Sequence, residues 1–327
     1  RWTRGDEAQR LNQTIISDAE VIALTPWPKL IDAIRDAFRA GGVSPTRHAH
    51  SVPGPGREDI SLLLMPAWNQ HGDFGVKLAI IAPSNAEFGV PRLASSYVVF
   101  SGKTGLPRAV LDAGALTARR TAAASALASR YLSREDSKTL FIIGTGRAAG
   151  QLAEAHCSER PIEEIRIWGR NSENALAAAE AAEKATGVKS VTVVDVASGA
   201  QGADIISAAT LADSPLLKAE WVETGTHIDL VGAFKPSMCE VDPATVAKTD
   251  QVFVDTMEGA MDEAGDLIQA VDAGVFSFDD VAGDLYKLSA SDTSLRRSPE
   301  EITMYKSVGV ALQDLAAAQL CLCLLYT

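Results

Sequence analysis

Short apolar runs separated by turn residues fill the first third of the chain. Four of these runs have the length and composition of strands, and they lie at residues 60–68, 74–82, 94–101 and 107–112. Turn-forming residues divide them, including the segments 83–89 and 102–105. This spacing is typical of an antiparallel sheet built from hairpins.

Two helices are predicted ahead of this sheet, between residues 17 and 40. Ser17 or Asp18 is a suitable N-cap for the first helix, and Thr25 followed by Pro26 opens the second. A loop rich in proline, glycine and histidine then leads to the first strand.

The periodicity changes in the middle of the chain. Residues 116–132 are alanine-rich with helical spacing, and we expect this helix to connect two domains. Beyond it, continuous apolar strand cores alternate with helical segments such as 172–186, which indicates a parallel sheet covered on both faces. The strand cores lie at residues 140–143, 165–168, 191–194, 204–208, 227–231 and 252–254. Residues 299–320 again predict a helix, with Ser298 as its cap.

These patterns predict an α/β protein of two domains. Residues 1–120 and 299–327 would form a discontinuous α+β domain with the antiparallel sheet, and residues 121–298 a parallel-sheet domain inserted into it. A chain of 327 residues is long enough to give each domain its own hydrophobic core.

A glycine turn gives the inserted domain a candidate ligand. Residues 139–150, TLFIIGTGRAAG, join an apolar strand to a helix through Gly144 and Gly146. The first glycine permits a tight turn, and the second lets backbone N–H groups approach a phosphate at the helix N-terminus. A small third residue, Ala149 or Gly150, lets the helix pack against the strand. A glycine turn alone is common, but in this setting it indicates a Rossmann-type domain that binds a dinucleotide.

The end of the second strand bears on the choice of dinucleotide. Arg170, Asn171 and Ser172 follow it. An NAD-preferring site usually has an acidic residue here for the ribose 2′-OH, whereas an arginine with two short polar neighbours suits a 2′-phosphate. A solvated loop arginine is the alternative, but the position about 20 residues beyond the glycine turn favours the phosphate. We therefore predict NADPH as the cofactor, with NADH as the alternative.

Composition limits the other function classes. The net charge of −12 and the pI of about 4.9 argue against a nucleic-acid or anionic-membrane surface. The four cysteines form no CxxC pair and have no histidine at zinc-ligand spacing, so we expect reduced thiols and no metal site. The longest apolar run, near residues 315–326, is too short and interrupted to span a bilayer, and no signal peptide is visible. A cytoplasmic protein that binds a small molecule is expected.

Cations at unusual positions are the candidates for chemistry. Lys77 lies in an apolar strand, where an ammonium must be paired or neutralised; a lysine at a sheet edge that reaches solvent is the alternative. A buried lysine can hydrogen-bond or exchange a proton with a substrate nitrogen or carbonyl. Of Arg119 and Arg120 in the alanine-rich helix, we expect Arg119 to face solvent and Arg120 to lie nearer the domain interface. Arg47, on the loop before the sheet, suits a carboxylate, although most loop arginines are simply solvated.

Taken together, these residues resemble the ornithine cyclodeaminase/mu-crystallin family over nearly the whole chain. The order and spacing of several stretches carry the resemblance rather than any one of them. The stretches are MPAW (65–68), GVK (75–77), PSNAEFGVP (83–91), SGKTGLP (101–107), LTARRTAA (116–123), IIGTG (142–146), GTHIDLVGAFKPSMCEVD (225–242), EAGDL (263–267) and EEITMYKSVG (300–309). The resemblance implies a homodimer with a Rossmann domain inserted into a dimerisation and substrate-binding domain. It also implies NAD(P)(H)-dependent chemistry on amino acids, imino acids or ketimines.

The resemblance further implies roles for individual residues. Arg47 and Arg120 would bind a substrate carboxylate, Lys77 would act with Arg120 at its reacting end, and Met65 and Phe234 would line the substrate site. The implied cofactor-binding residues are Gly144, Thr145, Gly146, Arg147, Ala148, Arg170, Asn171, Ser172, Ala209, Thr210 and Val231.

One position departs from the pattern of the family's cyclodeaminases. These carry an aspartate that interacts with the substrate's amine, and Phe234 stands in its place here. An aromatic ring cannot accept a proton or pair with an ammonium, so cyclodeamination of ornithine is disfavoured. Phe234 and Arg170 both resemble the ketimine reductase branch instead.

We therefore expect reduction of a cyclic ketimine carboxylate, Δ1-pyrroline-2-carboxylate or Δ1-piperideine-2-carboxylate, to L-proline or L-pipecolate. Ornithine cyclodeaminase-type activity, cis-3-hydroxy-L-proline dehydration and alanine dehydrogenase activity are alternatives within the family. His48 or His50 would serve a proton-transfer reaction, or simply belong to a polar loop. A non-catalytic NADPH-dependent carrier of small ligands, as mu-crystallin is, also stays open.

Overall fold

The computed structural model describes residues 14–54, 57–70 and 72–327 and divides the chain into two units. Unit 1 comprises residues 1–26, 40–117 and 311–327, and unit 2 comprises residues 27–39 and 118–310. The start of the predicted first domain, residues 1–13, and part of the predicted loop before the sheet, residues 55–56, lie outside the described residues.

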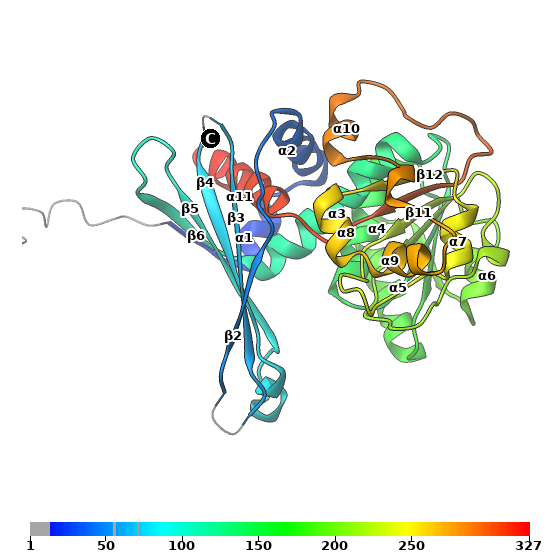
Figure 1. Cartoon of the computed structure of the whole chain (residues 1–327), viewed down its shortest axis with the longest axis horizontal. Coiled ribbons are helices and arrows are strands. Elements are labelled where there is room, and N and C mark those ends of the chain that lie inside the picture. The colour runs from blue at the N-terminus through cyan, green and yellow to red at the C-terminus, as the bar shows by residue number, and fades with distance from the viewer. Residues whose placement is uncertain (1–13, 55–56, 71) are drawn as a thin grey trace, which may run out of the picture. The chain divides into compact units, whose positions relative to one another are not determined.

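The described residues of unit 1 form a six-stranded sheet in the order β1-β6-β5-β4-β3-β2 (Figure 1). The four strands predicted from the sequence are β3 (Ile60–Trp68), β4 (Phe74–Ile81), β5 (Leu93–Phe100) and β6 (Pro107–Asp112). They pair antiparallel, as predicted. Two strands were not predicted. β2 (His48–Val52) adds an antiparallel edge, and β1 (Thr14–Ile16) pairs parallel with β6, so the sheet is mixed.

Helix α11 (Ala311–Leu325) lies along one face of this sheet and packs against β3, β4 and β5 (Figure 1). Alternation along each strand directs one set of side chains beneath the helix, and these are buried. They include Met65, Ala67, Lys77, Tyr97 and Leu111. The opposite face carries apolar side chains that are only partly buried, namely Leu62, Leu64, Val76, Leu78, Ile80 and Val98.

Local signals explain the short elements of unit 1. Ser17 caps α1 (Asp18–Ala23) as predicted, because its side chain accepts from the Glu20 N–H while the Glu20 carboxylate accepts from the Ser17 N–H. The 3₁₀ helix η2 (Pro83–Phe88) ends at Gly89, whose φ of +66° favours glycine.

An eight-stranded parallel sheet forms the centre of the described part of unit 2. Its strands are β7 (Thr139–Ile143), β8 (Glu164–Trp168), β9 (Lys189–Thr192), β10 (Ile205–Ala208), β11 (His227–Leu230), β12 (Gln251–Val254), β13 (Val281–Asp284) and β14 (Thr303–Lys306). The order is β13-β12-β14-β11-β10-β7-β8-β9. Taken along the sheet, the six strands β9-β8-β7-β10-β11-β14 reproduce the 3-2-1-4-5-6 order of a doubly wound sheet. This order confirms the predicted Rossmann-type fold.

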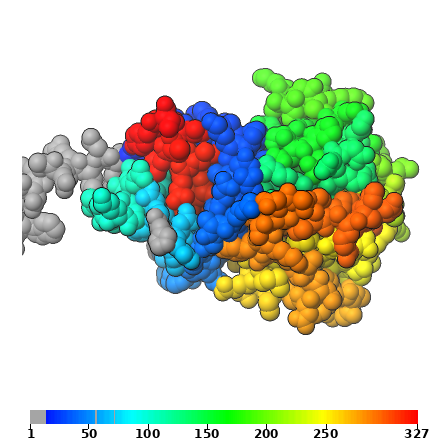
Figure 2. Space-filling model, turned by 90° about the horizontal axis from the view of Figure 1, so that it is seen from above, coloured from blue at the N-terminus to red at the C-terminus, as the bar shows by residue number. Residues whose placement is uncertain are grey.

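The helices alternate with these strands along the chain. They are α2 (Trp27–Arg39), α3 (Ala113–Leu132, of which 113–117 belong to unit 1), α4 (Arg147–Glu159), α5 (Ser172–Thr186), α6 (Val196–Ala200), α7 (Pro243–Lys248), α8 (Met257–Glu263), α9 (Gly265–Asp272) and α10 (Leu285–Ala290), with 3₁₀ turns η3 (Ala219–Trp221) and η4 (Phe278–Asp280). Figure 2 shows the orange segment that includes α10 and residues 291–300 on the surface of this unit.

The prediction of one helix over residues 299–320 is wrong in its first part. Residues 303–306 form β14, which is fully buried between β11 and β12, and α11 begins only at Ala311. Thr303 and Lys306 made this segment look unlike a buried strand. Both have buried partners distant in sequence: Thr303 donates to the Leu132 carbonyl, and Lys306 forms an ion pair with Asp266. Residues 299–310 therefore lie in unit 2, as do residues 27–39, where α2 packs against α4 and α10.

No helix in the described ranges is long and apolar enough to cross a membrane. The four cysteines all lie within those ranges and form no disulfide.

Buried histidine and aspartate side chains tie the strands of unit 2 together. His227 on β11 contacts Thr303 of β14 through its Nδ1, at 2.9 Å from the hydroxyl oxygen. Because that hydroxyl donates to Leu132, it accepts the Nδ1 proton of His227. Burial lowers the pKa of His227 to about 3. Asp229 accepts from Ser207 at 2.6 Å, and burial opposes its charge, yet the bonds from His156 and Ser207 hold its pKa below the ordinary value.

These shifts predict acid sensitivity. The unfolded chain binds a proton at His227 near pH 6.5, whereas the folded protein does not until about pH 3, so falling pH favours unfolding. Between pH 6.5 and about pH 4.5 this group should cost about 2–3 kcal/mol of unfolding free energy. His227→Asn keeps a donor for Thr303 but does not titrate. Urea unfolding should show a shallower loss of stability for this variant over that range, and an unchanged slope would contradict the assignment.

Candidate functional site

The glycine turn of unit 2 has the geometry that its sequence predicts. Gly144 follows β7 with a φ of +127°, in the region that favours glycine. A Cβ there would lie 2.7 Å from the Ala209 carbonyl oxygen, so no other residue fits this close approach between the β7 and β10 loops. Its N–H donates to the Trp168 carbonyl at 2.8 Å, which ties the turn to β8 as well.

The start of α4 leaves room for an anion. Gly146 is the N-cap of this 13-residue helix and makes no side-chain cap, and a Cβ placed on it would meet nothing within 4 Å. The first N–H groups of the helix thus have no side-chain cap, and the space at Gly146 is open beside the exposed Arg147. Ala149 is buried and Gly150 is open, so Ala149 is the small residue that packs the helix against the sheet. This cradle fits the pyrophosphate of a dinucleotide.

The second βα turn lies beside the first. A Cβ on Gly169 would come 2.4 Å from Cγ2 of Thr145, so the two turns are in close contact. Asn171 uses its side-chain oxygen to cap α5, accepting from the Asn174 N–H at 2.9 Å. Arg170 and Ser172 are exposed at the same helix N-terminus. An arginine beside a helix N-terminus is a suitable site for a phosphate.

The remaining predicted cofactor residues of unit 2 lie at the same edge of the sheet. Ala209 and Thr210 follow β10, Val231 follows β11, and all three are partly buried. Phe234 lies further along the loop after β11 and packs against the hydrophobic core of the unit while remaining partly exposed. Carboxyl ends of parallel strands meet at one edge, so the structure brings these residues to the side of the sheet where nucleotides bind.

The prediction that Arg119 faces solvent is wrong. Its side chain is buried, its guanidinium lies 3.9 Å from the centre of the Trp27 ring, and it donates to the Gln151 side chain at 3.1 Å. The sequence could not show that α2 would bring Trp27 over it. Arg120 is buried as well, and its guanidinium lies against Gly309, where a Cβ would come 2.9 Å from Nη1.

Asp255 fixes the turn that Arg120 contacts. Its carboxylate, buried at the end of β12, accepts from the N–H groups of Val308 at 2.9 Å and Gly309 at 2.6 Å. The turn is thereby held against the arginine without a side chain at residue 309.

In unit 1, Lys77 forms a buried ion pair that the sequence did not predict. Its ammonium lies 2.8 Å from Oδ2 of Asp314 on α11, and the two side chains are 4% and 0% exposed. Lys77 therefore does not reach solvent at a sheet edge, which removes that alternative. The signal that pointed to Lys77, a charged residue in an apolar element, applies equally to Asp314 in α11 and could have identified it.

Met65 and Tyr97 flank Lys77 across the strands on the same face of the sheet. Tyr97 is fully buried, its hydroxyl has no hydrogen-bond partner among the described residues, and burial together with the charge of Asp314 raises its pKa well above the ordinary value. Its ring covers Gly75, where a Cβ would lie 2.4 Å from the hydroxyl oxygen. Tyr97 therefore keeps its proton, and its neutral hydroxyl is a hydrogen-bond donor beside β4, the strand that carries Lys77.

The two histidines of β2 project from the other face of the sheet. His48 pairs with Leu64 and His50 with Leu62, whereas Lys77 shares the face of Met65. A proton relay that combines either histidine with Lys77 is thus disfavoured within unit 1. Arg47, immediately before β2, is partly buried.

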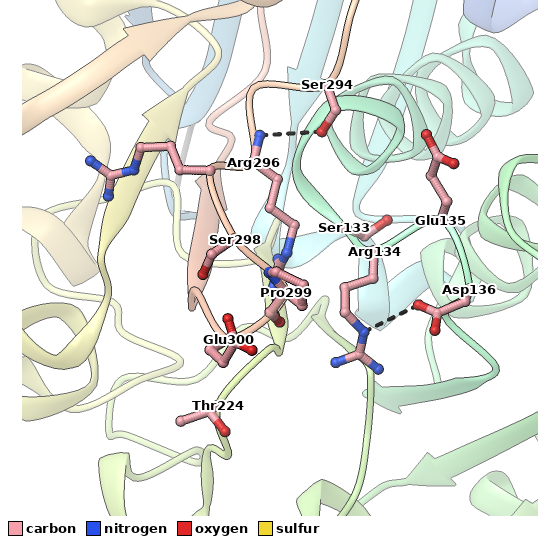
Figure 3. Close-up of a pocket in the computed structure, with 11 residues that line it drawn as sticks. Ser133, Arg134, Glu135, Asp136, Thr224, Ser294, Arg296, Ser298, Pro299 and Glu300 are labelled. Carbon is pink, nitrogen blue, oxygen red and sulfur yellow. Dashed lines mark hydrogen bonds and ion pairs between the residues drawn. The ribbon is translucent and has the colours of Figure 1, made fainter.

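A pocket of about 650 Å³ lies at the opposite, amino edge of the sheet of unit 2 (Figure 3). Arg134 and Arg296 extend into it from the segments before β7 and β14. Both guanidiniums bind main-chain oxygens, including the Gly225 carbonyl, and Arg134 also pairs with Asp204. These arginines tie together the loops that precede the strands, so we assign the pocket a structural role. In the described ranges, no three His, Cys, Asp or Glu side chains gather as metal ligands would.

Comparison with known proteins agrees with this geometry. The model of the ornithine cyclodeaminase/mu-crystallin family matches residues 12–322. The chain belongs to this family.

Individual relatives extend along almost the full chain. An uncharacterized protein of Schizosaccharomyces pombe is 43% identical over 305 residues, which are 90% of this chain and 92% of the relative. A Delta(1)-pyrroline-2-carboxylate reductase of Colwellia psychrerythraea is 35% identical over 93% of this chain and 96% of its own. The structure of the Thermococcus litoralis Delta(1)-pyrroline-2-carboxylate reductase, in complex with NADH and L-proline, is 32% identical with a TM-score of 0.87, covering 94% of this chain and 96% of that one.

Several stretches that carry the family resemblance meet in the structure of unit 2. Residues 225–242 supply Glu240, residues 263–267 supply Asp266, and residues 300–309 supply Lys306, all buried. These stretches therefore encode one buried charged cluster at the carboxyl edge, and periodicity of the sequence alone gave no sign of it.

The ion pair of Lys77 with Asp314 yields a prediction about stability. Asp314→Leu would leave a buried ammonium without its countercharge, at a cost of about 3–5 kcal/mol in unfolding free energy. The double variant Lys77→Met/Asp314→Leu removes both charges and should regain most of that loss. Urea unfolding of the wild type, both single variants and the double variant measures this coupling, and additive losses would contradict a buried pair.

Proposed function

We propose that the protein is an NAD(P)H-dependent reductase of cyclic ketimine carboxylates, converting Δ1-pyrroline-2-carboxylate, and the homologous Δ1-piperideine-2-carboxylate, to L-proline and L-pipecolate. The observation that carries the proposal is the likeness, over 94% of this chain, to a reductase solved with NADH and L-proline. The open cradle at Gly144 and Gly146 supports the cofactor, and Phe234 in place of an amine-binding aspartate supports a substrate without a distal ammonium.

The proposed roles follow from the chemistry of each group. A bound nicotinamide cofactor supplies the hydride, which adds to C2 of the C=N bond. Arg47 and Arg120 hold the carboxylate through charged hydrogen bonds, which orients C2 and lowers the entropic part of the barrier. Lys77 donates a proton or a hydrogen bond to the imine nitrogen, so that the C=N bond gains one hydride and one proton.

Asp314 supports the role of Lys77. A buried ammonium tends to lose its proton, but a carboxylate at 2.8 Å favours the charged form. The pair therefore keeps a proton donor available in an apolar setting. Met65, beside Lys77 on the same face, and Phe234 supply apolar contact for the ring methylenes in this proposal.

We further propose a cytoplasmic homodimer. The partly buried apolar face of the unit 1 sheet, formed by Leu62, Leu64, Val76, Leu78, Ile80 and Val98, is a suitable dimer surface because large apolar patches mark association sites. Cysteines without disulfides accord with a reducing compartment.

Oxidation of NADPH in the presence of Δ1-pyrroline-2-carboxylate at near-neutral pH tests the reaction. We expect turnover with this substrate and with the piperideine homologue, and no ammonia from L-ornithine with NAD. Arg120→Lys keeps the charge but loses the planar fork, and should lower kcat/KM by about 100-fold. Arg119→Lys is the matched control, since Arg119 is occupied by Trp27 and Gln151, and should change kcat/KM far less. Ammonia release from ornithine without imine reduction would refute the proposal.

The preference for NADPH rests on Arg170. The related structure was solved with NADH, so this part of the proposal depends on the exposed arginine at the start of α5. Arg170→Ala should raise the KM for NADPH by about tenfold, the effect of losing one charged phosphate contact of about 1.4 kcal/mol, with little change for NADH. Lys184→Ala, which removes an exposed cation at the other end of α5, is the control. Equal effects on both cofactors would contradict a 2′-phosphate contact.

A further inference from the structure

A single buried carboxylate joins two loops at the carboxyl edge of the unit 2 sheet. Glu240 is fully buried, and its Oε1 accepts from the N–H of Thr210 at 2.6 Å and from the Thr210 hydroxyl at 2.9 Å. Its Oε2 accepts from the N–H of Gly232 at 2.7 Å. Thr210 follows β10 and Gly232 follows β11, so the carboxylate bridges the ends of neighbouring strands.

The two loops are in unusually close contact. A Cβ on Gly232 would lie 2.0 Å from the Thr210 carbonyl oxygen and 2.4 Å from Oε1 of Glu240. Glycine is therefore required at residue 232, and its N–H is turned inward to the carboxylate. The Glu240 carboxylate therefore joins the two loops where their main chains approach each other.

The position of these loops in the sheet assigns them to one half of the cofactor. In the 3-2-1-4-5-6 order, β7 and β8 are the first and second strands, and their turns carry Gly144 and Arg170. In this fold the first half of the sheet holds the adenosine side of a dinucleotide, so the nicotinamide side falls to the second half. β10 and β11 are the fourth and fifth strands, and the loops bridged by Glu240 therefore belong to the nicotinamide half.

Two further buried charges hold Glu240 in place. Oδ1 of Asp266 accepts from the N–H of Glu240 at 2.5 Å and of Val241 at 3.1 Å, and Oδ2 pairs with Lys306 Nζ at 2.8 Å. Burial raises the pKa of Glu240 above its ordinary value, while the charge of Lys306 opposes this. Its three accepted hydrogen bonds all favour the carboxylate form.

We propose that Glu240 is a positioning residue for the nicotinamide half of the cofactor: it sets the spacing of the β10 and β11 loops on which that half is seated. This inference rests on the proposed function, since it takes the bound dinucleotide as given. It assigns Glu240 no contact with the cofactor, and its effect passes through Thr210 and Gly232.

The test compares the whole cofactor with its adenosine half. Glu240→Gln has the same shape, but its amide must turn an NH₂ toward the N–H of Thr210 or Gly232, leaving a buried donor unpaired. By titration calorimetry on the full chain, the Kd for NADPH should rise by about tenfold or more, as the loss of one buried hydrogen bond implies. The Kd for adenosine 2′,5′-bisphosphate should stay within about twofold, because the Gly144 and Arg170 turns are untouched. NADH and ADP form the second pair of probes.

A matched control separates positioning from stability. Asp204 also binds backbone N–H groups at strand ends, those of Lys138 and Thr139, but at the amino edge of the same sheet. Asp204→Asn should lower the melting temperature while leaving the ratio of the two Kd values unchanged. If Glu240→Gln does not fold, Glu240→Asp, which keeps the charge but is too short to reach both loops, serves in its place.

The possible results are distinguishable. Selective loss of NADPH affinity supports the positioning role. Equal loss for NADPH and the adenosine half, or loss for neither, overturns it and leaves Glu240 a structural residue. A wild-type protein that binds the adenosine half and NADPH normally but reduces no ketimine contradicts the proposed function and not the role of Glu240.

Discussion

Backbone N–H groups at the carboxyl edge of a parallel sheet need partners, and in a nucleotide-binding sheet these partners must not fill the crevice. Unit 2 meets this requirement with carboxylates placed beneath the loops. Glu240 binds the β10 and β11 loops, Asp266 binds the backbone of Glu240, and Asp255 binds the turn at Gly309. The crevice side can then be lined by glycines, as at Gly144 and Gly232, where a Cβ would meet main chain. The proposed cofactor site depends on this arrangement.

Unit 1 also buries a polar group that needs a partner, in this case a charged side chain. An ammonium under an apolar helix is costly to bury, and the pairing of Lys77 with Asp314 offsets that cost. The pair lies beside Met65 and Tyr97 in an otherwise apolar layer, where the proposed mechanism uses Lys77 as the proton donor. An exposed lysine would be a weaker hydrogen-bond partner for an imine, because water competes for its protons.

Much of this architecture could be predicted because local signals dominate it. The Gly144 turn, the Ser17 cap and the apolar strands of unit 2 each depend on neighbours in sequence. The failures have a common cause, which is partners distant in sequence. β14 was not predicted because Thr303 and Lys306 are polar, and their partners Leu132 and Asp266 are distant in sequence. Arg119 was expected in solvent because the ring that covers it, Trp27, lies 92 residues earlier in the chain. Asp314 and Glu240 were missed for the same reason, since a buried charge reveals its role only with its partner.

Isotope transfer tests the central claim, hydride delivery to the C=N carbon of a cyclic ketimine carboxylate, most directly. The protein would be incubated with Δ1-pyrroline-2-carboxylate and NADPH carrying deuterium at both C4 positions, and the product examined by mass spectrometry and NMR. The account predicts L-proline one mass unit heavier, with the deuterium at the α-carbon. No proline, or proline without label at that carbon, would contradict it.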